Sequence, residues 1–159
     1  MAECCIPFKI FFACLPNSWN FKLKLVCMDT VSALKFIGKI HSELKRIEDC
    51  PLQENENAPA AIVEILPEFI EGIKDVKVGS KILLLTWLHQ ADRSVIKCVP
   101  RNNYDLPMVG VFSTRSPDRP NPIGIHSVKV LSIENNILKV SALEVLDQTP
   151  LIDIKPMLN

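Results

Sequence analysis

Residues 123–146 read IGIHSVKVLSIENNILKVSALEVL, and this stretch decides the fold. Its two arms are rich in isoleucine, valine and leucine, and they meet at Asn135 and Asn136. Asparagine tolerates the positive φ that a tight two-residue turn requires, so we expect an antiparallel hairpin here. The alternation of apolar residues changes face between Val130 and Leu131. Such a slip indicates a bulge or strong coiling, by which an antiparallel sheet curls toward a barrel.

The remaining apolar residues from Ala33 onward come in short runs without helical spacing, which is typical of strands. The run ILLLTWL at 82–88 is apolar on both faces and predicts a central strand. A short helical segment is predicted at 67–73, because Pro67 suits a first turn. We therefore expect a mainly β fold, a small antiparallel β-barrel with short helical segments. The expected strands cover residues 34–41, 61–66, 81–89, 94–99, 108–113, 123–133, 137–146 and 151–154.

The chain has 159 residues, 48% of them hydrophobic, which is enough for one compact domain but not for two. The first 27 residues differ in character from the rest and contain an apolar patch at 6–15. Pro7 and Lys9 interrupt this patch, whereas a signal peptide needs an uninterrupted apolar stretch. The patch is also shorter than the ~20 apolar residues of a membrane span, so no membrane association is expected. We expect residues 1–28 to be a poorly ordered N-terminal extension and residues 29–159 to form the single barrel domain.

Charge is balanced overall but uneven along the chain. Eighteen basic and eighteen acidic residues give no net charge, which excludes a global field that attracts nucleic acid or membranes. Residues 43–77 hold nine carboxylates and four cations, whereas residues 93–129 hold six cations and two carboxylates. The second segment would suit an anionic partner.

The cysteines and histidines give no support to a disulfide framework or a metal site. Four of the six cysteines lie in the first 27 residues, and the chain has no C-x-x-C pair. The three histidines are isolated, without H-x-x-x-H or H-x-H spacing. We expect a reduced, cytoplasmic protein without a metal.

A second informative stretch is GVFSTRSPDRPNPIG at 110–124, in which three prolines surround Arg115 and Arg119. Each proline fixes its own φ and restricts the residue before it, so the loop is stiff. The flanking glycines, Gly110 and Gly124, suit close backbone approach or unusual φ. A carboxylate or phosphate would fit this cationic clamp. The alternative is a scaffold loop whose arginines pair with nearby carboxylates.

Two further clusters carry polar groups. His89 and Gln90 end the central strand, where a buried, satisfied histidine is the common alternative to a ligand contact. Residues 146–156 read LDQTPLIDIKP, with Asp147 in a turn that needs no function to explain it. Asp153 and Lys155 fall on one strand face, and strands seldom carry Asp and Lys beside a core position without a partner, which favours a functional role.

Together these three clusters resemble the TsaA-like family, whose best characterised members are tRNA methyltransferases of the TrmO type. The stretch 110–124 is similar to the family signature G-V-F-(A/S)-T-R-S-x-x-R-P-N-P-I-G, and 146–156 to L-D-x-T-P-(V/L)-x-D-I-K-P. His89 and Gln90 match a strand-ending H-Q, and IGKIHS at 37–42 is similar to the opening strand. The resemblance covers about residues 33–157.

The resemblance implies a small antiparallel β-barrel that binds S-adenosylmethionine and works as a homodimer. It further implies methylation of N6 of threonylcarbamoyl-adenosine next to the tRNA anticodon. The five glycines form no G-x-G-x-x-G turn, which agrees with a cofactor site outside a Rossmann fold. The residues expected around the cofactor are Pro51, Leu52, Gln53, His89, Gln90, Arg115, Ser127, Asp147, Gln148, Thr149 and Pro150. Those expected at the substrate are Arg119, Asn121, Asp153 and Lys155.

The chain departs from the family pattern at two of the matched positions. The family's P-R-Q corresponds to Pro51-Leu52-Gln53, so one arginine is missing, and its I-K-P-Y ending appears as Lys155-Pro156-Met157. Larger bacterial members also have a C-terminal domain. These departures bear on tRNA affinity and substrate identity.

Methyl transfer from a sulfonium requires the methyl carbon and the acceptor nitrogen to be held close together. It also requires a group that takes the proton of this weakly nucleophilic nitrogen. Asp147, His89 and Tyr104 are the candidates for this proton acceptor, and the sequence does not rank them. Two other functions fit less fully. One is a non-catalytic module that binds RNA or an adenine metabolite. The other is a hydrolase built on His89, Asp147 and Asp153, which lacks a nucleophile motif.

Overall fold

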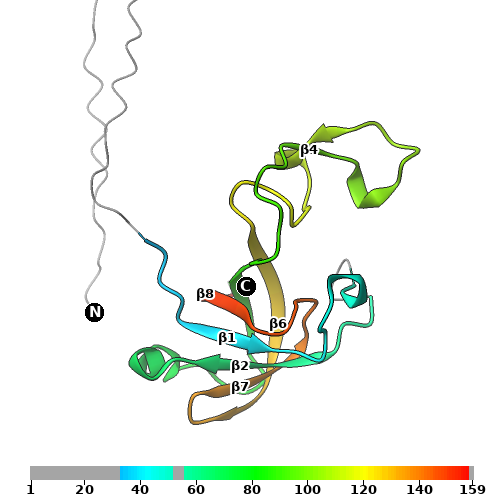
Figure 1. Cartoon of the computed structure of the whole chain (residues 1–159). Helices are drawn as coiled ribbons and strands as arrows, with labels where there is room; N and C mark the ends of the chain where they lie inside the picture. Colours follow the sequence, from blue (N-terminus) through cyan, green and yellow to red (C-terminus); the bar gives the residue numbers. More distant parts are fainter. Residues whose placement is uncertain (1–32, 52–55, 158–159) are drawn as a thin grey trace, which may run out of the picture. The chain divides into compact units, whose positions relative to one another are not determined.

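The computed structural model describes residues 33–51 and 56–157, and the predicted extension lies outside these residues. Figure 1 shows a curled sheet with a long excursion between β3 and β6. The strands are β1 (Gly38–His41), β2 (Ala60–Ile65), β3 (Lys81–Trp87), β4 (Lys97–Cys98), β5 (Val109–Gly110), β6 (Ile123–Glu134), β7 (Ile137–Ala142) and β8 (Thr149–Pro156). The 3-10 helices are η1 (Ile47–Asp49), η2 (Pro67–Ile73), η3 (Pro100–Asn102) and η4 (Val111–Ser113).

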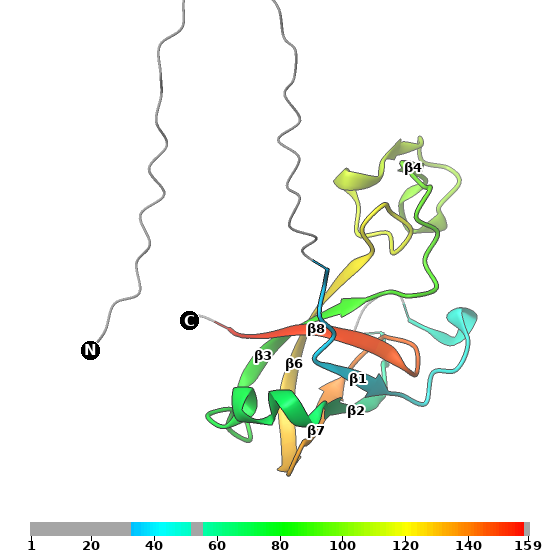
Figure 2. The ribbon, with the colours of Figure 1, turned by 60° about the vertical axis from the view of Figure 1, so that its left-hand side comes forward.

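Six of the strands close into an antiparallel barrel in the order β1-β2-β7-β6-β3-β8. The rotated view in Figure 2 shows β3 and β6 crossing β8 and continuing above it into the excursion, with β7 below β1 and β8. Strands β4 and β5 form a separate two-stranded sheet within the excursion, which covers residues 88–122. The predicted mainly β barrel is confirmed.

The predicted hairpin is confirmed as β6 and β7. Asn135 has φ of 54°, the left-handed conformation that a tight turn requires. The register shifts between Val130 and Ser132, where the phase of the sequence changes. This irregularity is the bulge expected of a strand that curls into a barrel.

The barrel interior is filled by branched aliphatic side chains that alternate with outward residues. On β3, Ile82, Leu84 and Thr86 are buried, while Leu83 and Leu85 are partly exposed on the outer wall. Strand β3 pairs with both β6 and β8, as its two apolar faces predicted. The helical segment at 67–73 is a 3-10 helix, η2, with Ile73 buried at its end.

Shortening Leu84 to alanine is expected to lower the free energy of unfolding by about 2–5 kcal/mol, because the side chain is fully buried in a closed barrel. Urea unfolding followed by circular dichroism measures the change. Leu34→Ala is the matched control, since Leu34 is 50% exposed ahead of β1 and should cost well under half as much. Equal losses for the two variants would contradict the described packing.

None of the helices described in residues 33–51 and 56–157 has the length and apolar character needed to span a membrane.

Candidate functional site

The chain segments after β3 and before β6 meet at one end of the barrel. Because Trp87 at the end of β3 lies opposite Ile123 at the start of β6, His89 and Gln90 leave the barrel where the proline-rich loop enters it. Both side chains are exposed. The alternative interpretation of His89, a buried histidine with its hydrogen bonds made inside the protein, is therefore wrong.

The turn before β8 lies at the same end. Thr86, near the end of β3, pairs with Leu151 of β8, and Ile40 of β1 pairs with Thr149. The turn therefore lies beside the ends of both β1 and β3. We call this end of the barrel, with residues 88–90, 110–122 and 147–150, the motif end.

The proline-rich loop is tied to its surroundings by several hydrogen bonds. The Asp92 amide donates to Asp118 Oδ1 (2.8 Å), and Arg93 Nε donates to the Pro120 carbonyl (3.0 Å). The Arg93 guanidinium also lies over the Trp87 ring, 5.3 Å from its centroid, a cation–π arrangement. The rigid loop predicted from its prolines thus has side-chain support as well.

Arg119 is a structural part of its own loop. Its Nε donates to the Ser116 carbonyl (2.8 Å), and its Nη2 donates to the carbonyls of Thr114 (2.6 Å) and Val111 (3.4 Å). The side chain is half-buried, and these bonds use much of its donor fork. The contact of Arg119 with substrate stays a prediction. In the structure its side chain instead holds the loop together through these hydrogen bonds.

Arg115 has a different environment. Its side chain is exposed, and within residues 33–51 and 56–157 it makes no hydrogen bond or ion pair.

The two glycines that flank the proline-rich loop differ from each other. Gly110 has an ordinary φ of −62° and open space around it, so the expected close approach is absent there. At Gly124 a Cβ would lie 2.5 Å from both His126 Nε2 and Thr86 Oγ1, so close packing requires glycine.

Asp147 anchors the turn before β8. Its Oδ1 accepts the Ser42 amide (3.0 Å), and its Oδ2 pairs with Lys45 Nζ (2.7 Å). The hydrogen bond from Lys45, assisted by the Ser42 amide, lowers the pKa of Asp147 from 3.8 to about 2. Gln148 has φ of 63° and approaches His41, with its Nε2 3.2 Å from Nδ1 of that ring. Both oxygens of Asp147 are therefore engaged by the protein.

Replacing Asp147 with asparagine is expected to lower the free energy of unfolding at pH 7 by on the order of 1 kcal/mol, since solvent screens the exposed Lys45 partner. The folded pKa of Asp147 lies below its unfolded value, so this stability is present above about pH 4 and is lost as pH falls toward 2. Urea unfolding between pH 7 and pH 2 measures it. The exposed Asp75→Asn variant is the control, and identical acid profiles for both would contradict the anchoring role.

Three of the predicted residues lie on the outer wall of the barrel. Ser127 and Lys155 both pair with Leu83 in the middle of β3. Ser127 Oγ lies 3.2 Å from Met157 Sδ, and Lys155 Nζ pairs with Asp153 Oδ2 (2.6 Å). Within one chain, these side chains are therefore separated along β3 from the motif end.

Three other predicted residues lie in separate segments of the described chain. Pro51 follows β1 and η1, while Leu52 and Gln53 lie outside the described residues. Asn121 is exposed in the proline-rich loop, and Tyr104, in the excursion, is 85% exposed.

The sequence analysis missed a buried polar chain at the motif end. His126 Nδ1 lies 2.6 Å from Glu144 Oε1, and His126 Nε2 lies 2.9 Å from Thr86 Oγ1. Burial opposes ionisation of Glu144, but the hydrogen bond and charge of His126, with a smaller effect of Arg115, lower its pKa below the usual range. A usable signal was His126 itself, because the alternation of β6 places it on the inner face with Val128.

Among the described residues, no group of three or more histidine, cysteine, aspartate or glutamate side chains is arranged to hold a metal ion.

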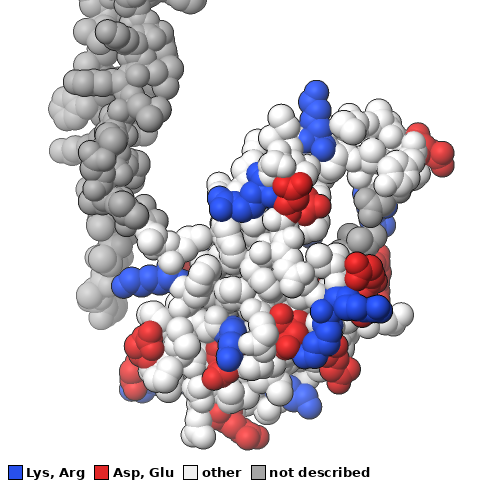
Figure 3. Space-filling model, viewed as in Figure 1, with Lys and Arg blue, Asp and Glu red and all other residues white. Residues whose placement is uncertain are grey.

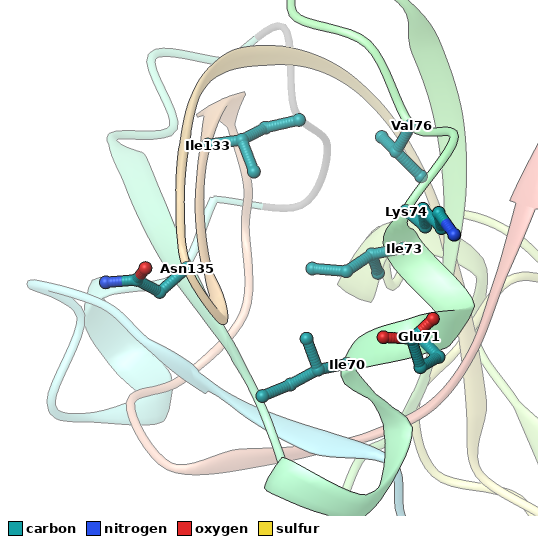
Figure 4. A pocket seen from close by; sticks show the side chains of 7 residues that line it. All are labelled: Ile70, Glu71, Ile73, Lys74, Val76, Ile133 and Asn135. Carbon is teal, nitrogen blue, oxygen red and sulfur yellow. The ribbon is translucent and has the colours of Figure 1, made fainter.

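A cavity of about 300 Å³ lies at the other end of the barrel, between η2 and the β6–β7 turn. Ile70, Ile73, Val76 and Ile133 point into it, whereas the amide of Asn135 points away from these side chains (Figure 4). Glu71 and Lys74 complete its lining. It contains none of the predicted site residues, so it is separate from the motif end.

Charges on the face shown in Figure 3 are mixed, with Lys and Arg next to Asp and Glu over the barrel. The surplus of cations in residues 93–129 therefore does not form one continuous basic surface on this face.

Comparison with known proteins identifies the family. A family model described as the tRNA-methyltransferase O N-terminal domain matches residues 39–159. A probable S-adenosyl-L-methionine-binding protein of Archaeoglobus fulgidus is 41% identical over 123 residues, which are 77% of this chain and 33% of the relative. A protein described in the same way from Methanothermobacter thermautotrophicus is 39% identical over 120 residues, 76% of this chain and 85% of the relative.

A crystal structure of TrmO from Pseudomonas aeruginosa has a similar fold, with a TM-score of 0.64 and 32% identity. The match covers 79% of this chain and 55% of the TrmO chain. This chain therefore spans about half the length of that enzyme and a third of the Archaeoglobus relative. The matched family model, the relatives and the shared barrel show that the chain belongs to the family of the tRNA-methyltransferase O N-terminal domain.

Proposed function

We propose that this protein binds S-adenosylmethionine at the motif end and transfers its methyl group to N6 of threonylcarbamoyl-adenosine next to a tRNA anticodon. The observation that carries the proposal is the contrast between two arginines on one rigid loop. Arg119 is bonded to carbonyls of the loop, whereas the exposed Arg115 has no hydrogen-bond partner among the described residues. A charged group presented on a fixed support is the arrangement that an anionic ligand requires.

The residues at the motif end fit the charges of the cofactor. S-adenosylmethionine carries a carboxylate, which suits the exposed, cationic Arg115. The turn 147–150, which we propose lines the same site, is fixed by Asp147 and by the buried Thr149, whose Oγ1 donates to the Leu146 carbonyl (2.7 Å). Relatives described as S-adenosyl-L-methionine-binding proteins support this assignment.

The bound cofactor supplies an activated methyl group, and the protein must orient the acceptor and accept a proton. Among the three candidates, Asp147 is the weakest base, because its pKa is about 2 and both of its oxygens are engaged. His89 and Tyr104 are exposed and free to approach a bound nucleoside. We propose that one of these two takes the proton of the acceptor nitrogen.

We also propose that the protein works as a homodimer. The outer wall formed by β3, β6 and β8 exposes apolar side chains, among them Ile125 at 53%, Ile123 and Leu131. The excursion exposes Ile96 and Phe112 as well. A second copy packed on these surfaces would shield them from water.

The test is nucleoside analysis by mass spectrometry of tRNA incubated with protein and S-adenosylmethionine carrying a labelled methyl group. We expect label on threonylcarbamoyl-adenosine and none on tRNA that lacks this nucleoside. Tight binding of tRNA or cofactor without any incorporated label would instead support a non-catalytic binding module of the same fold.

A further inference from the structure

Glu144 has a buried carboxylate oxygen without a hydrogen-bond partner. Its Oε1 accepts from His126 at 2.6 Å, whereas its Oε2 is buried and has no partner among the described residues. The Glu144 side chain is only 15% exposed. Native proteins rarely leave a buried polar atom unsatisfied, so such an atom indicates a missing donor.

The position of Glu144 is fixed from behind. An ionised carboxylate only accepts hydrogen bonds, so His126 Nδ1 carries a proton and donates it to Oε1. The other ring nitrogen, Nε2, is 2.9 Å from Thr86 Oγ1, and Thr86 is fully buried. Gly124 leaves just enough room for this pair. Contacts among β3, β6 and the segment after β7 therefore fix the direction in which Glu144 Oε2 points.

The charge of Glu144 acts on two segments of the proposed cofactor site. Arg115 contributes to lowering the pKa of Glu144, so the two charges are close enough to interact. Burial raises the pKa of the Cys50 thiol, and the charges of Asp49 and Glu144 raise it further. Topology also brings these groups to one end of the barrel, because Glu144 follows β7 and bonds to His126 near the start of β6, where the loop that contains Arg115 enters.

We propose that Glu144 positions Arg115, with Oε2 accepting a hydrogen bond from one edge of the guanidinium. The guanidinium has five N–H donors in a planar fork, so its other edge stays available for the carboxylate of the methyl donor. Arg115 is exposed and makes no hydrogen bond among the described residues, so the proposal requires its side chain to turn toward Glu144. The inference rests on the proposed function, because it gives Arg115 the cofactor as its ligand. It adds a positioning residue that the family resemblance did not place in the site.

A double-mutant cycle on S-adenosylmethionine affinity tests the inference. Calorimetry would compare the unaltered protein with Arg115→Ala, Glu144→Gln and the double variant. We expect Glu144→Gln to weaken binding about tenfold when Arg115 is present and less than about twofold when it is absent. Glu134→Gln, an exposed carboxylate at the far end of β6, is the matched control and should change nothing. Additive effects of the two substitutions would overturn the inference.

A second measurement does not depend on how well Glu144→Gln folds or on cofactor binding. NMR titration of the Glu144 carboxyl would compare the unaltered protein with Arg115→Ala, which alters an exposed side chain only. We expect the pKa of Glu144 to rise when Arg115 is removed, and we expect the rise to persist in about 1 M salt, which screens a through-space charge but not a direct hydrogen bond. An unchanged pKa, or a rise that disappears in high salt, would overturn the positioning role. If the unaltered protein binds no S-adenosylmethionine, the proposed function fails while this titration still decides the Arg115–Glu144 contact.

Discussion

Replacing Arg115 with alanine is expected to reduce the methyl transfer rate by more than tenfold, which corresponds to at least about 1.4 kcal/mol of lost binding or transition-state stabilisation. Arg115 is exposed and has no hydrogen-bond partner among the described residues, so its removal should leave the barrel unchanged. The measurement is incorporation of labelled methyl groups into tRNA, combined with a thermal unfolding curve. A loss of rate at an unchanged melting temperature is the result expected of a ligand-binding side chain.

Arg101→Ala is the control for this experiment. Arg101 is also exposed and lies in the same excursion, but its Nη2 pairs with Glu56 Oε1 at 3.1 Å. We expect at most a small change in rate from this variant. Equal transfer rates for the Arg115 variant and the unaltered protein would remove Arg115 from the site.

Replacing Arg119 with alanine is expected to lower the transfer rate about tenfold or more by another route. Its three bonds to loop carbonyls are charge-assisted, and each such bond contributes roughly 1.5–3 kcal/mol in favourable cases. Without them the loop no longer holds Arg115 in one place. Limited proteolysis and hydrogen exchange should therefore show faster cleavage and exchange between residues 111 and 122.

The matched control for Arg119 is Arg46→Ala. Arg46 also fixes a local turn, through two hydrogen bonds to Asp49 at 2.9 and 2.8 Å, but it lies outside the loop. This variant should leave protection of residues 111–122 unchanged. If the Arg119 variant loses activity while the loop keeps full protection, Arg119 contacts the substrate directly, as the family resemblance implies.

The sequence predicted the barrel well because its signals are local. The turn at Asn135 and the change of phase near Val130 are properties of neighbouring residues, and both are present in the structure. The apolar faces of residues 82–88 likewise predicted a strand with two partners. The excursion is less regular than expected, since the strands predicted at 94–99 and 108–113 shorten to two residues each.

The different environments of Arg115 and Arg119 were not predictable from the sequence. Arg115 and Arg119 lie four positions apart in one motif, and only the three-dimensional path of the loop brings carbonyls to Arg119 alone. Asp147 was predicted in a turn, but its bonds to Ser42 and Lys45 join segments about a hundred residues apart. Pairings over such distances depend on which strands become neighbours when the barrel closes, and no local pattern specifies these neighbours.

The buried chain at Glu144 was missed for the same reason. His126 lies two residues after the proline-rich signature, and Glu144 lies three residues before Asp147. Each residue therefore lies just outside a motif, and nothing in the sequence indicates that the two are in contact. The barrel brings them together with Thr86 at the motif end. A histidine at an inward position of an aliphatic strand indicates a buried polar contact, and this signal could have directed attention to β6.

Calorimetric titration with S-adenosylmethionine, performed in parallel on the unaltered protein and on Arg115→Ala, tests the central claim most directly. We expect saturable binding to the unaltered protein and an affinity at least about tenfold lower for the variant. Absence of saturable heat, or equal affinity in both proteins, would contradict a cofactor site at the motif end.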